Sequence, residues 1–356
     1  MRIAIVVGTR PEIVKMAPVV RACRARGVPY VLLHTGQHYS HELNDIFFDE
    51  LGLPQPDHNL EVGSGSAVEQ ISRIMTGMEP LLRKTAPDVV LVEGDTNSVL
   101  AAALAAFKIG IPVGHVEAGL RSYDRRMPEE VNRILTDHLS DYLFAPTDTA
   151  RGILRGEGIA DTRIHLTGNT VVDELLLQRG RAEQGRHFRR FAVEPGGYAL
   201  ATVHRAENTD HPGRLANIFT GLSASASELR MPVLAALHPR TVARLSANRL
   251  GVPDNVRVIP PLGYLEFLGL HASAALMLTD SGGLQEEACT LRVPCVTLRE
   301  NTERPESLAV GANELAGTDP ARIVEAACRM IRRPRQWLNP FGDGRSGERI
   351  ISLLAA

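Results

Sequence analysis

The sequence lacks several features that would assign it to a common class of protein. No run approaches the ~18 consecutive apolar residues of a membrane-spanning helix, and no signal peptide precedes the first apolar run, Ile3–Val7. The four cysteines show no CxxC spacing and are typical of a reduced, cytoplasmic protein. The formal charge of −2 gives no reason to expect binding to nucleic acid or to an acidic membrane surface.

Signatures of common cofactor and metal sites are also missing. No GxGxxG follows the first apolar run, which argues against a dinucleotide site, and no GxxxxGK[ST] marks a P-loop. The 12 histidines form no HExxH or other paired spacing, so we expect no bound metal. GxSxG occurs only in a broken form, Gly63-Ser64-Gly65-Ser66, which does not support a serine triad.

What the sequence has is a regular alternation of short apolar runs and helix-length segments. Its 356 residues exceed one typical core and predict two domains. The alternation predicts parallel sheets with helices on both faces. The predicted strands are Ile3–Val7, Tyr30–His34, Val89–Glu93, Val113–Glu117, Tyr142–Ala145, Arg163–Thr167, Tyr198–Val203, Val233–Leu237, Val256–Ile259, Ala274–Leu278 and Cys295–Leu298. The predicted helices of the first half are Glu12–Arg26, His41–Leu51, Val68–Lys84, Val99–Ile109, Pro128–Leu139 and Thr147–Glu157.

The polar, arginine-rich segment Gln178–Arg190 interrupts this alternation and is the predicted linker. We therefore predict an α/β fold in which two Rossmann-like domains, residues 1–180 and 191–340, face each other across a cleft. A tail over residues 341–356 is expected to form a helix, Arg345–Leu354, that crosses back to the first domain. Ligands of such sheets bind beyond the carboxyl ends of the strands.

The most informative segment runs from Asp280 to Glu287, directly behind the apolar run Ala274–Leu278. It predicts a buried strand, a tight glycine turn and the start of a helix. Gly282 and Gly283 would let the backbone approach a ligand, and the first N–H groups of the helix would bind an anion such as a diphosphate. Glu287, one turn further on, is placed to bind ribose hydroxyls. An ordinary capped helix is the alternative.

Polar residues also follow the predicted strands of the first half. Arg10 and Lys15, after the first strand, are both candidates for binding an anion. Asp95 follows the third strand, where the alternative is a plain helix N-cap. Glu117 ends the fourth strand, a place where a carboxylate is a poor choice for a core.

Further candidates lie on a helix of the first half and throughout the second half. Pro128–Arg133 opens a helix, and the helix dipole is the alternative explanation for Glu129 in its first turn. His204 emerges at the end of the strand that begins the second half, where a structural histidine is the alternative. Leu262–Phe267 offers an aromatic ring and main chain to a base, and Arg304 is a cation just after a strand.

Taken together, these segments resemble the non-hydrolysing UDP-N-acetylglucosamine 2-epimerase family. Each segment is weak evidence alone, but the set covers the chain in the right order. The matching stretches are Gly8–Pro18, Thr35–Tyr39, Glu93–Thr96, His115–Ser122, Pro128–Arg133, Gly168–Asp173, Thr202–Asn208, Thr279–Glu287, Thr302–Glu306 and Asn339–Gly344. The resemblance implies a glycosyltransferase-B-like pair of domains, a homodimer, no redox cofactor, and interconversion of UDP-GlcNAc and UDP-ManNAc.

The resemblance also implies a mechanism and roles for residues. UDP leaves C1 with loss of the C2 proton, 2-acetamidoglucal forms, and UDP adds again after a proton reaches the opposite face of C2. The implied catalytic residues are Asp95, Glu117, Glu129 and His204, and the implied substrate contacts are Arg10, Lys15, Arg133, Leu262, Phe267, Ser281, Gly282, Gly283, Glu287 and Arg304. Three neighbouring carboxylates are expected to raise one another's pKa values.

Two segments depart from bacterial members that UDP-GlcNAc activates at a second site. The loop Arg121–Met127 is short and Gln37–Asp45 differs, so we do not expect allosteric activation. The alternatives are a hydrolysing 2-epimerase that releases ManNAc and UDP, a 2-epimerase of a related UDP-2-acetamido sugar, a glycosyltransferase, and a nucleotide-sugar-binding protein without catalysis. The number of ionisable groups at strand ends argues against the last of these.

Overall fold

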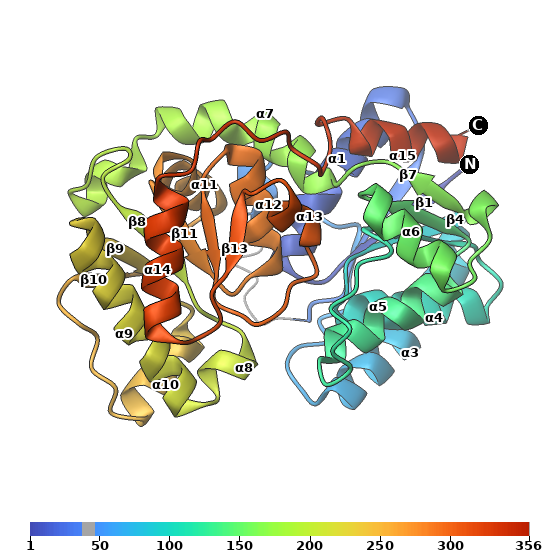
Figure 1. Ribbon diagram of the computed structural model, residues 1–356. Helices are drawn as coiled ribbons and strands as arrows, with labels where there is room; N and C mark the ends of the chain where they lie inside the picture. The colour runs from blue at the N-terminus through green and yellow to red at the C-terminus, as the bar shows by residue number, and fades with distance from the viewer. Residues whose placement is uncertain (38–46, 356) are drawn as a thin grey trace. The chain divides into compact units, whose positions relative to one another are not determined.

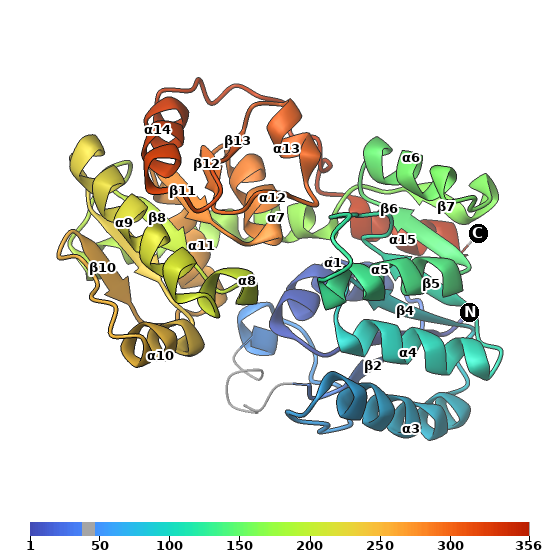
Figure 2. The ribbon, with the colours of Figure 1, turned by 60° about the horizontal axis from the view of Figure 1, so that its bottom comes forward.

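The computed structural model describes residues 1–37 and 47–355 and contains two separate β-sheets (Figure 1). The chain divides into two compact units: unit 1 comprises Met1–Glu174 and Phe341–Ala356, and unit 2 comprises Leu175–Pro340. Every strand pairing that the structure describes is parallel. The two views show helices on both faces of each sheet, so the predicted fold class of two Rossmann-like parallel sheets is confirmed (Figures 1 and 2).

Unit 1 contains a seven-stranded sheet in the order β3-β2-β1-β4-β5-β6-β7. Its strands are β1 Ile3–Val7, β2 Tyr30–His34, β3 His58–Asn59, β4 Val89–Glu93, β5 Val113–Val116, β6 Tyr142–Ala145 and β7 Ile164–Leu166. Its helices are α1 Arg10–Arg26, α3 Ala67–Thr85, α4 Asn97–Lys108, α5 Pro128–Leu139, α6 Asp148–Gly156, η1 Asp161–Arg163 and α15 Ser346–Ala355. Helix α7, Thr170–Gln184, begins in unit 1 and continues into unit 2.

Unit 2 contains a six-stranded sheet in the order β10-β9-β8-β11-β12-β13. Its strands are β8 Ala199–Thr202, β9 Val233–Ala236, β10 Val256–Ile259, β11 Leu276–Thr279, β12 Cys295–Thr297 and β13 Asn313–Leu315. Its helices are η2 His187–Phe191, α8 Ala206–Thr209, α9 Pro212–Leu229, α10 Pro239–Ala247, α11 Tyr264–Ser273, α12 Gly282–Leu291, α13 Pro305–Ala309 and α14 Pro320–Ile331.

The central strands are continuous apolar runs because helices cover them on both faces. All five residues of β1 and all five of β4 are buried. In unit 1 the strand residues Val6 and Val92 belong to the same buried cluster as Ile74 and Leu82 of α3. In unit 2 a second cluster joins the sheet to α9 and α14. Each unit therefore has a core of its own.

The sequence did not predict β3 and β13, which contain only two and three residues. Such short edge strands offer too few residues for an apolar pattern to stand out. The segment Gln178–Arg190, predicted as a linker, is mostly helical, since it holds the end of α7 and most of η2. The first six residues of the predicted helix His41–Leu51 lie outside the described residues. In its described part, residues 47–50 are helical.

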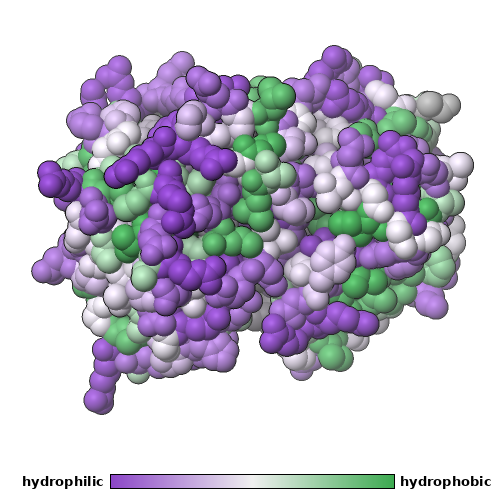
Figure 3. All heavy atoms as spheres, in the orientation of Figure 1, coloured by the Kyte–Doolittle hydropathy of each residue, from purple (hydrophilic) through white to green (hydrophobic). Residues whose placement is uncertain are grey.

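The surface mixes residues of opposite character. On the face drawn in Figure 3, hydrophilic and hydrophobic residues are interspersed, and the large apolar side chains exposed on the described surface include Val68, Phe107 and Leu338. Among the described residues, no helix combines the length and apolarity that crossing a bilayer requires.

Helix α15 returns to unit 1 and packs against α1, beside which it lies in Figure 1. The contact is close at Gly347, where an added Cβ would lie 2.7 Å from the carbonyl carbon and oxygen of Pro18. The backbone N–H of Gly347 also donates to the Asp173 carboxylate at 2.8 Å. Only glycine fits here without moving α15, because the opposing atoms belong to the main chain.

We therefore expect Gly347→Ala to lower the free energy of unfolding by about 1–3 kcal/mol, the usual cost of overpacking. Gly152→Ala on α6 is the matched control, because its added methyl meets no atom within 4 Å. The control is expected to be neutral or up to ~1 kcal/mol more stable, as alanine is the better helix former. Urea unfolding followed by far-UV circular dichroism measures both. Equal midpoints for the two variants would contradict the close contact.

Candidate active site

Each sheet reverses its strand order at the first strand of its unit. Strand β1 lies between β2 and β4, and β8 lies between β9 and β11. At such a switch point the following loops diverge in opposite directions and leave a crevice at the carboxyl ends of the strands, where ligands of open α/β sheets bind. The candidate residues of unit 1 follow β1, β4 and β5, and those of unit 2 follow β8, β10, β11 and β12.

Glu12, in the first turn of α1, is buried at the switch point of unit 1. Its carboxylate accepts hydrogen bonds from the backbone N–H of Gly8 at 2.6 Å and from the hydroxyls of Thr9 at 3.0 Å and Thr96 at 2.7 Å. Burial raises the pKa of Glu12 to about 7. The three hydrogen bonds lower this pKa in part, and the charge of Asp95 raises it slightly. This carboxyl therefore titrates near neutrality.

Lys15, one turn further along α1, joins two buried carboxylates. Its Nζ lies 2.9 Å from Oε1 of Glu93 and 2.6 Å from Oε2 of Glu117. The Nδ2 of Asn169 donates to the same Glu117 oxygen at 2.9 Å. Burial raises the pKa of Glu93 well above its usual range, because Lys15 offsets only part of that cost and Glu117 adds repulsion. Lys15 thus holds two carboxylates that would otherwise repel each other.

Glu117 also has an unusual backbone conformation. Its φ of 67° lies in the left-handed region, which costs a residue with a side chain roughly 1–2 kcal/mol. The two hydrogen-bond donors on its carboxylate, Lys15 and Asn169, hold the side chain in place. Backbone strain maintained by surrounding contacts is a recurring feature of functional sites.

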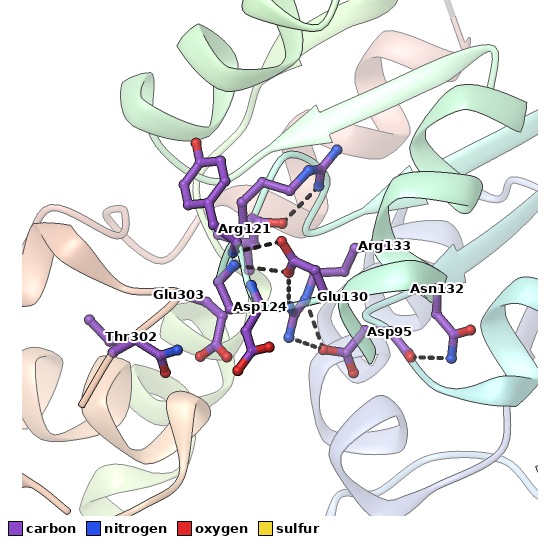
Figure 4. Close-up of polar contacts among 12 residues, drawn as sticks. Asp95, Arg121, Asp124, Glu130, Asn132, Arg133, Thr302 and Glu303 are labelled. Carbon is purple, nitrogen blue, oxygen red and sulfur yellow. Dashed lines mark hydrogen bonds and ion pairs between the residues drawn. The ribbon is translucent and has the colours of Figure 1, made fainter. Parts of the chain in front are cut away.

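Asp95 belongs to a second cluster, which Figure 4 shows. The Arg133 guanidinium lies between Asp95 and Glu130: Nη2 is 2.6 Å from Oδ2 of Asp95, and Nη1 is 2.6 Å from Oε2 of Glu130. Asn132 donates to the backbone carbonyl of Asp95 at 2.9 Å. The N-cap of α4 is Thr96, so capping does not explain Asp95.

Of the two glutamates that begin α5, Glu130 is buried and Glu129 is half-buried. Glu130 accepts hydrogen bonds from the backbone N–H groups of Ser122 at 2.9 Å and Tyr123 at 2.8 Å. It therefore fixes the loop between β5 and α5. Glu129, predicted as a catalytic group, lies beside it in the same helical turn.

A buried histidine–carboxylate pair connects the loops that carry Asp95 and Glu117. The ring nitrogens of His115 lie 2.7 Å from Oδ1 of Asp137 and 2.8 Å from the carbonyl oxygen of Gly94. Asp137 also accepts from the N–H of Gly119 at 3.2 Å. Burial alone would raise the pKa of Asp137, but His115 and Arg121 outweigh burial and hold that pKa below its usual value.

In unit 2, Asp280 orients His204. The Asp280 carboxylate is fully buried and accepts from the backbone N–H groups of His204 at 3.1 Å and Arg205 at 3.0 Å, and from Asn208 Nδ2 at 3.1 Å. The Nδ1 of His204 lies 3.1 Å from Oδ1 of Asp280. The His204 side chain is 45% exposed, so an imidazole fixed through one nitrogen reaches solvent.

The N-terminus of α12 follows β11 directly. Ser281 caps the helix, with its Oγ accepting from Leu284 N–H at 3.4 Å. The sequence predicted a tight glycine turn here, and this prediction is wrong. Gly282 and Gly283 are the first two residues of α12, and neither has a positive φ. The extended backbone of Ser281 supplies the change of direction instead. The free N–H groups of the first turn remain available to an anion.

Two buried arginines lie in the loop after β12, close to this helix end. A Cβ added to Gly282 would lie 3.1 Å from Oε2 of Glu303 and 4.0 Å from Cζ of Arg304. Arg304 forms an ion pair with buried Glu286 of α12. Arg299 is fully buried and bonded to Glu303 at 2.8 Å. The predicted cation Arg304 therefore lies beside the helix N-terminus, already paired with a carboxylate.

The predicted base and ribose contacts lie on α11 and α12. Leu262 is half-buried and precedes α11, and Phe267 of α11 makes an edge contact with His271 at 5.9 Å between ring centroids. The Nδ1 of His271 lies 3.7 Å from Oε2 of Glu287. In unit 1 the last predicted contact, Arg10, places its guanidinium 5.2 Å from the ring centre of Phe47.

Sequence reasoning gave no role to Glu12, Glu93, Asn169, Asp280 or Arg299. Glu93 ends an apolar run and Asp280 follows another by two residues, a signal similar to the one that singled out Glu117, so both were within reach of the sequence. Asn169 had no local signal, because its partner Glu117 is 52 positions away. Within residues 1–37 and 47–355, no group of three histidine, cysteine or acidic side chains is arranged to hold a metal ion.

A family model for UDP-N-acetylglucosamine 2-epimerase matches residues 21–355. The chain belongs to this family. It is 49% identical over 360 residues to the UDP-N-acetylglucosamine 2-epimerase of Methanococcus maripaludis, covering 99% of this chain and 98% of that protein. It is 41% identical over 361 residues to the UDP-2,3-diacetamido-2,3-dideoxy-D-glucuronate 2-epimerase of Pseudomonas aeruginosa, covering 100% and 99%.

A solved structure of the family has the same fold over the whole chain. The crystal structure of Methanocaldococcus jannaschii UDP-GlcNAc 2-epimerase in complex with UDP-GlcNAc and UDP matches with a TM-score of 0.94 and 48% identity, covering 100% of this chain and 99% of that one. The resemblance to the UDP-N-acetylglucosamine 2-epimerase family drawn from the sequence is therefore confirmed.

The raised pKa of Glu12 predicts a pH-dependent loss of stability. Because the folded state binds this proton more tightly than the unfolded state, the stabilisation is complete below pH ~4.5 and is lost as the pH rises towards about 7. The loss is at most about 3 kcal/mol for a shift of this size. We expect the urea midpoint of the wild type to fall more steeply between pH 5 and pH 8 than that of Glu12→Gln. Parallel pH dependences would contradict the assignment.

Proposed function

We propose that the protein reversibly epimerises C2 of UDP-GlcNAc to give UDP-ManNAc without hydrolysis. The observation that carries the proposal is the set of buried carboxylates at the switch point of unit 1. This set occurs in a chain similar over its whole length to an epimerase whose crystal structure contains UDP-GlcNAc and UDP. A binding protein would have no use for strained, buried ionisable groups at the ends of strands.

The chemistry requires two proton transfers and a leaving group that is retained. The proton at C2 lies beside an acetamido group and is weakly acidic, so direct removal would be slow. Instead, the C1–O bond breaks and UDP takes its electron pair, while a base takes the C2 proton and the C2–H electrons form the C1=C2 bond. A proton then adds to the opposite face of C2, and the UDP oxygen re-forms its bond to C1.

In this proposal the unit 1 carboxylates perform the proton transfers. Asp95, Glu117 and Glu129 act around the sugar, and Arg133 holds Asp95. His204, oriented by Asp280, contacts the substrate and its phosphate. Positioned groups of this kind contribute ~10²–10⁴-fold to a rate.

The UDP moiety is proposed to bind to unit 2. The free N–H groups after Ser281, at Gly282 and Gly283, bind the diphosphate with the helix dipole of α12. Glu287 binds the ribose, while Leu262 (through its backbone) and Phe267 hold the uracil. Arg304 adds a cation to this site, and Arg10 of unit 1 is a further proposed substrate contact.

A second candidate is supported by the Pseudomonas relative. The same residues suit a 2-epimerase of a related UDP-2-acetamido sugar, because the chain is 41% identical to an enzyme named for a UDP-2,3-diacetamido sugar. The elimination mechanism applies equally to such a substrate.

We further propose that the protein is a cytoplasmic homodimer that needs neither a metal nor a redox cofactor.

Incubation with UDP-GlcNAc in deuterated water tests the reaction. We expect NMR to show UDP-ManNAc at equilibrium with UDP-GlcNAc and deuterium at C2 of both epimers, without added nicotinamide cofactor or divalent ion. Accumulation of free ManNAc and UDP would identify the hydrolysing reaction instead. A strict requirement for NAD or a metal would exclude the proposed mechanism, and conversion only of a diacetamido sugar would favour the second candidate.

Gly283→Ala tests the diphosphate site without disturbing the fold. The added methyl would meet only Oγ of Ser281, at 4.0 Å, whereas the same change at Gly282 would crowd Glu303. We expect the affinity for UDP, measured by calorimetry, to fall at least ~10-fold, because phosphate must approach this backbone closely.

Glu287→Gln weakens a charge-assisted hydrogen bond worth roughly 1.5–3 kcal/mol, so the affinity of this variant for UDP is expected to fall by about one to two decades.

Gly213→Ala is the matched control for this experiment. Gly213 occupies the first turn of α9 in the same unit, and its added methyl meets no atom within 4 Å. UDP affinity in this variant is expected to equal that of the wild type. Unchanged UDP binding in well-folded Gly283→Ala and Glu287→Gln would place the nucleotide elsewhere.

A further inference from the structure

We propose that Glu93 is a positioning residue of the unit 1 site, which acts through Lys15 on the carboxylate of Glu117. The catalytic consequence rests on the proposed function, whereas the coupling among the three side chains does not. The sequence made Lys15 a candidate for binding an anion of the substrate and gave Glu93 no role. The geometry assigns both to Glu117.

The contacts among these side chains are short, and the residues come from three different elements. Glu93 ends β4 and is 1% exposed, and Glu117 follows the neighbouring strand β5 and is 6% exposed. The ammonium of Lys15 reaches both from α1, at 2.9 Å and 2.6 Å. An ion pair shared in this way is specified by the fold, because each partner is fixed on its own element.

Among the contacts of Lys15 that the structure describes, the charges do not balance if every carboxyl is ionised. Glu12, Glu93 and Glu117 supply three buried carboxyls, and Lys15 is the cation that contacts two of them. Burying an unpaired charge is costly, so a buried carboxyl in excess of the available cations tends to keep a proton. The direction of the shift at Glu93 agrees, since its pKa is raised by burial and by the repulsion of Glu117.

The state of Glu93 therefore sets how much of the Lys15 ammonium is available to Glu117. When Glu93 is ionised, it competes for Lys15 and repels Glu117. When Glu93 carries a proton, Lys15 pairs with Glu117 without this competition. The titratable groups that face Glu93 are Lys15 and Glu12 from α1 and Glu117 from the loop after β5. Through this competition Glu93 adjusts the basicity of a group proposed to exchange a proton with the sugar.

Glu93→Gln is the decisive variant, because it keeps the shape of the side chain and removes its charge. Where Glu93 is ionised in the wild type, we expect the kcat values of the two proteins to differ ~10-fold, less than the upper range for a group that transfers the proton itself. At lower pH the two values are expected to agree. The wild-type kcat profile is expected to change a second time as the pH rises through the raised pKa of Glu93. This second change is expected to be absent from Glu93→Gln, because no second carboxylate then competes for Lys15. KM and the calorimetric affinity for UDP stay within about twofold of the wild type, since Glu93 is expected to make no contact with the nucleotide.

Glu174→Gln is the matched control. Glu174 is also a fully buried glutamate of unit 1 paired with a cation on α1, in its case Arg21. This variant is expected to melt at a lower temperature than the wild type, while its kcat profile keeps its position on the pH axis. An equal effect on the pH profile in both variants would show that Glu93 has only a structural role.

Lys15→Met separates the two possible roles of the lysine. If Lys15 serves Glu117, this variant loses turnover and retains its affinity for UDP. A loss of UDP affinity above ~10-fold would return Lys15 to the diphosphate and overturn the proposal.

A spectroscopic measurement makes the test independent of activity. In protein labelled with [δ-13C]glutamate, the Glu117 signal is assigned by its absence from Glu117→Gln. In the wild type this signal is expected to respond a second time as Glu93 ionises at higher pH, and that response is expected to be lost in Glu93→Gln and kept in Glu174→Gln. A second response that persists in Glu93→Gln overturns the coupling even in an active enzyme. If the wild type fails to epimerise UDP-GlcNAc, the proposed function fails alone, and the titration still decides the role of Glu93.

Discussion

The switch point of unit 1 depends on the sharing of one ammonium group between two buried carboxylates. Without Lys15, Glu93 and Glu117 would repel each other in a place where water cannot screen them. The left-handed backbone at Glu117 adds to the energy that these contacts must offset. Such an arrangement does not favour stability, because well-packed apolar side chains would usually serve as well or better. Its presence is most simply explained by chemistry.

Each unit contains a buried aspartate that fixes loops near the proposed site. In unit 1 the buried Asp137 contacts His115 and Arg121 and accepts the N–H of Gly119, while His115 also contacts the carbonyl oxygen of Gly94, so that the loops following β4 and β5 are fixed. In unit 2 the buried Asp280 accepts two backbone N–H groups and one imidazole nitrogen, which fixes the loop after β8. In both, a carboxylate without contact to solvent fixes a loop that carries residues proposed to meet the substrate.

The sequence predicted most of the fold because strands that are buried on both faces of a parallel sheet consist of continuous apolar runs. Strands such as β1 and β4 match their predicted ranges residue for residue. The edge strands β3 and β13 escaped because pairing with a neighbour, and not an apolar pattern, creates them. Candidate residues such as Asp95 and His204 were recognisable from their places after strands. Their partners Arg133 and Asp280 could be assigned only in three dimensions, since the pairings span 38 and 76 positions.

The return of α15 to α1 has a consequence for the order in which the protein matures. Unit 1 consists of two stretches of chain, with all of unit 2 between them. During synthesis the first stretch leaves the ribosome long before α15 does, so the surface of α1 that α15 covers stays exposed while unit 2 is being made. Domains generally fold as units in their order of synthesis. Unit 1, which begins first, is therefore completed after unit 2, because α15 can pack against α1 only once unit 2 has been synthesised.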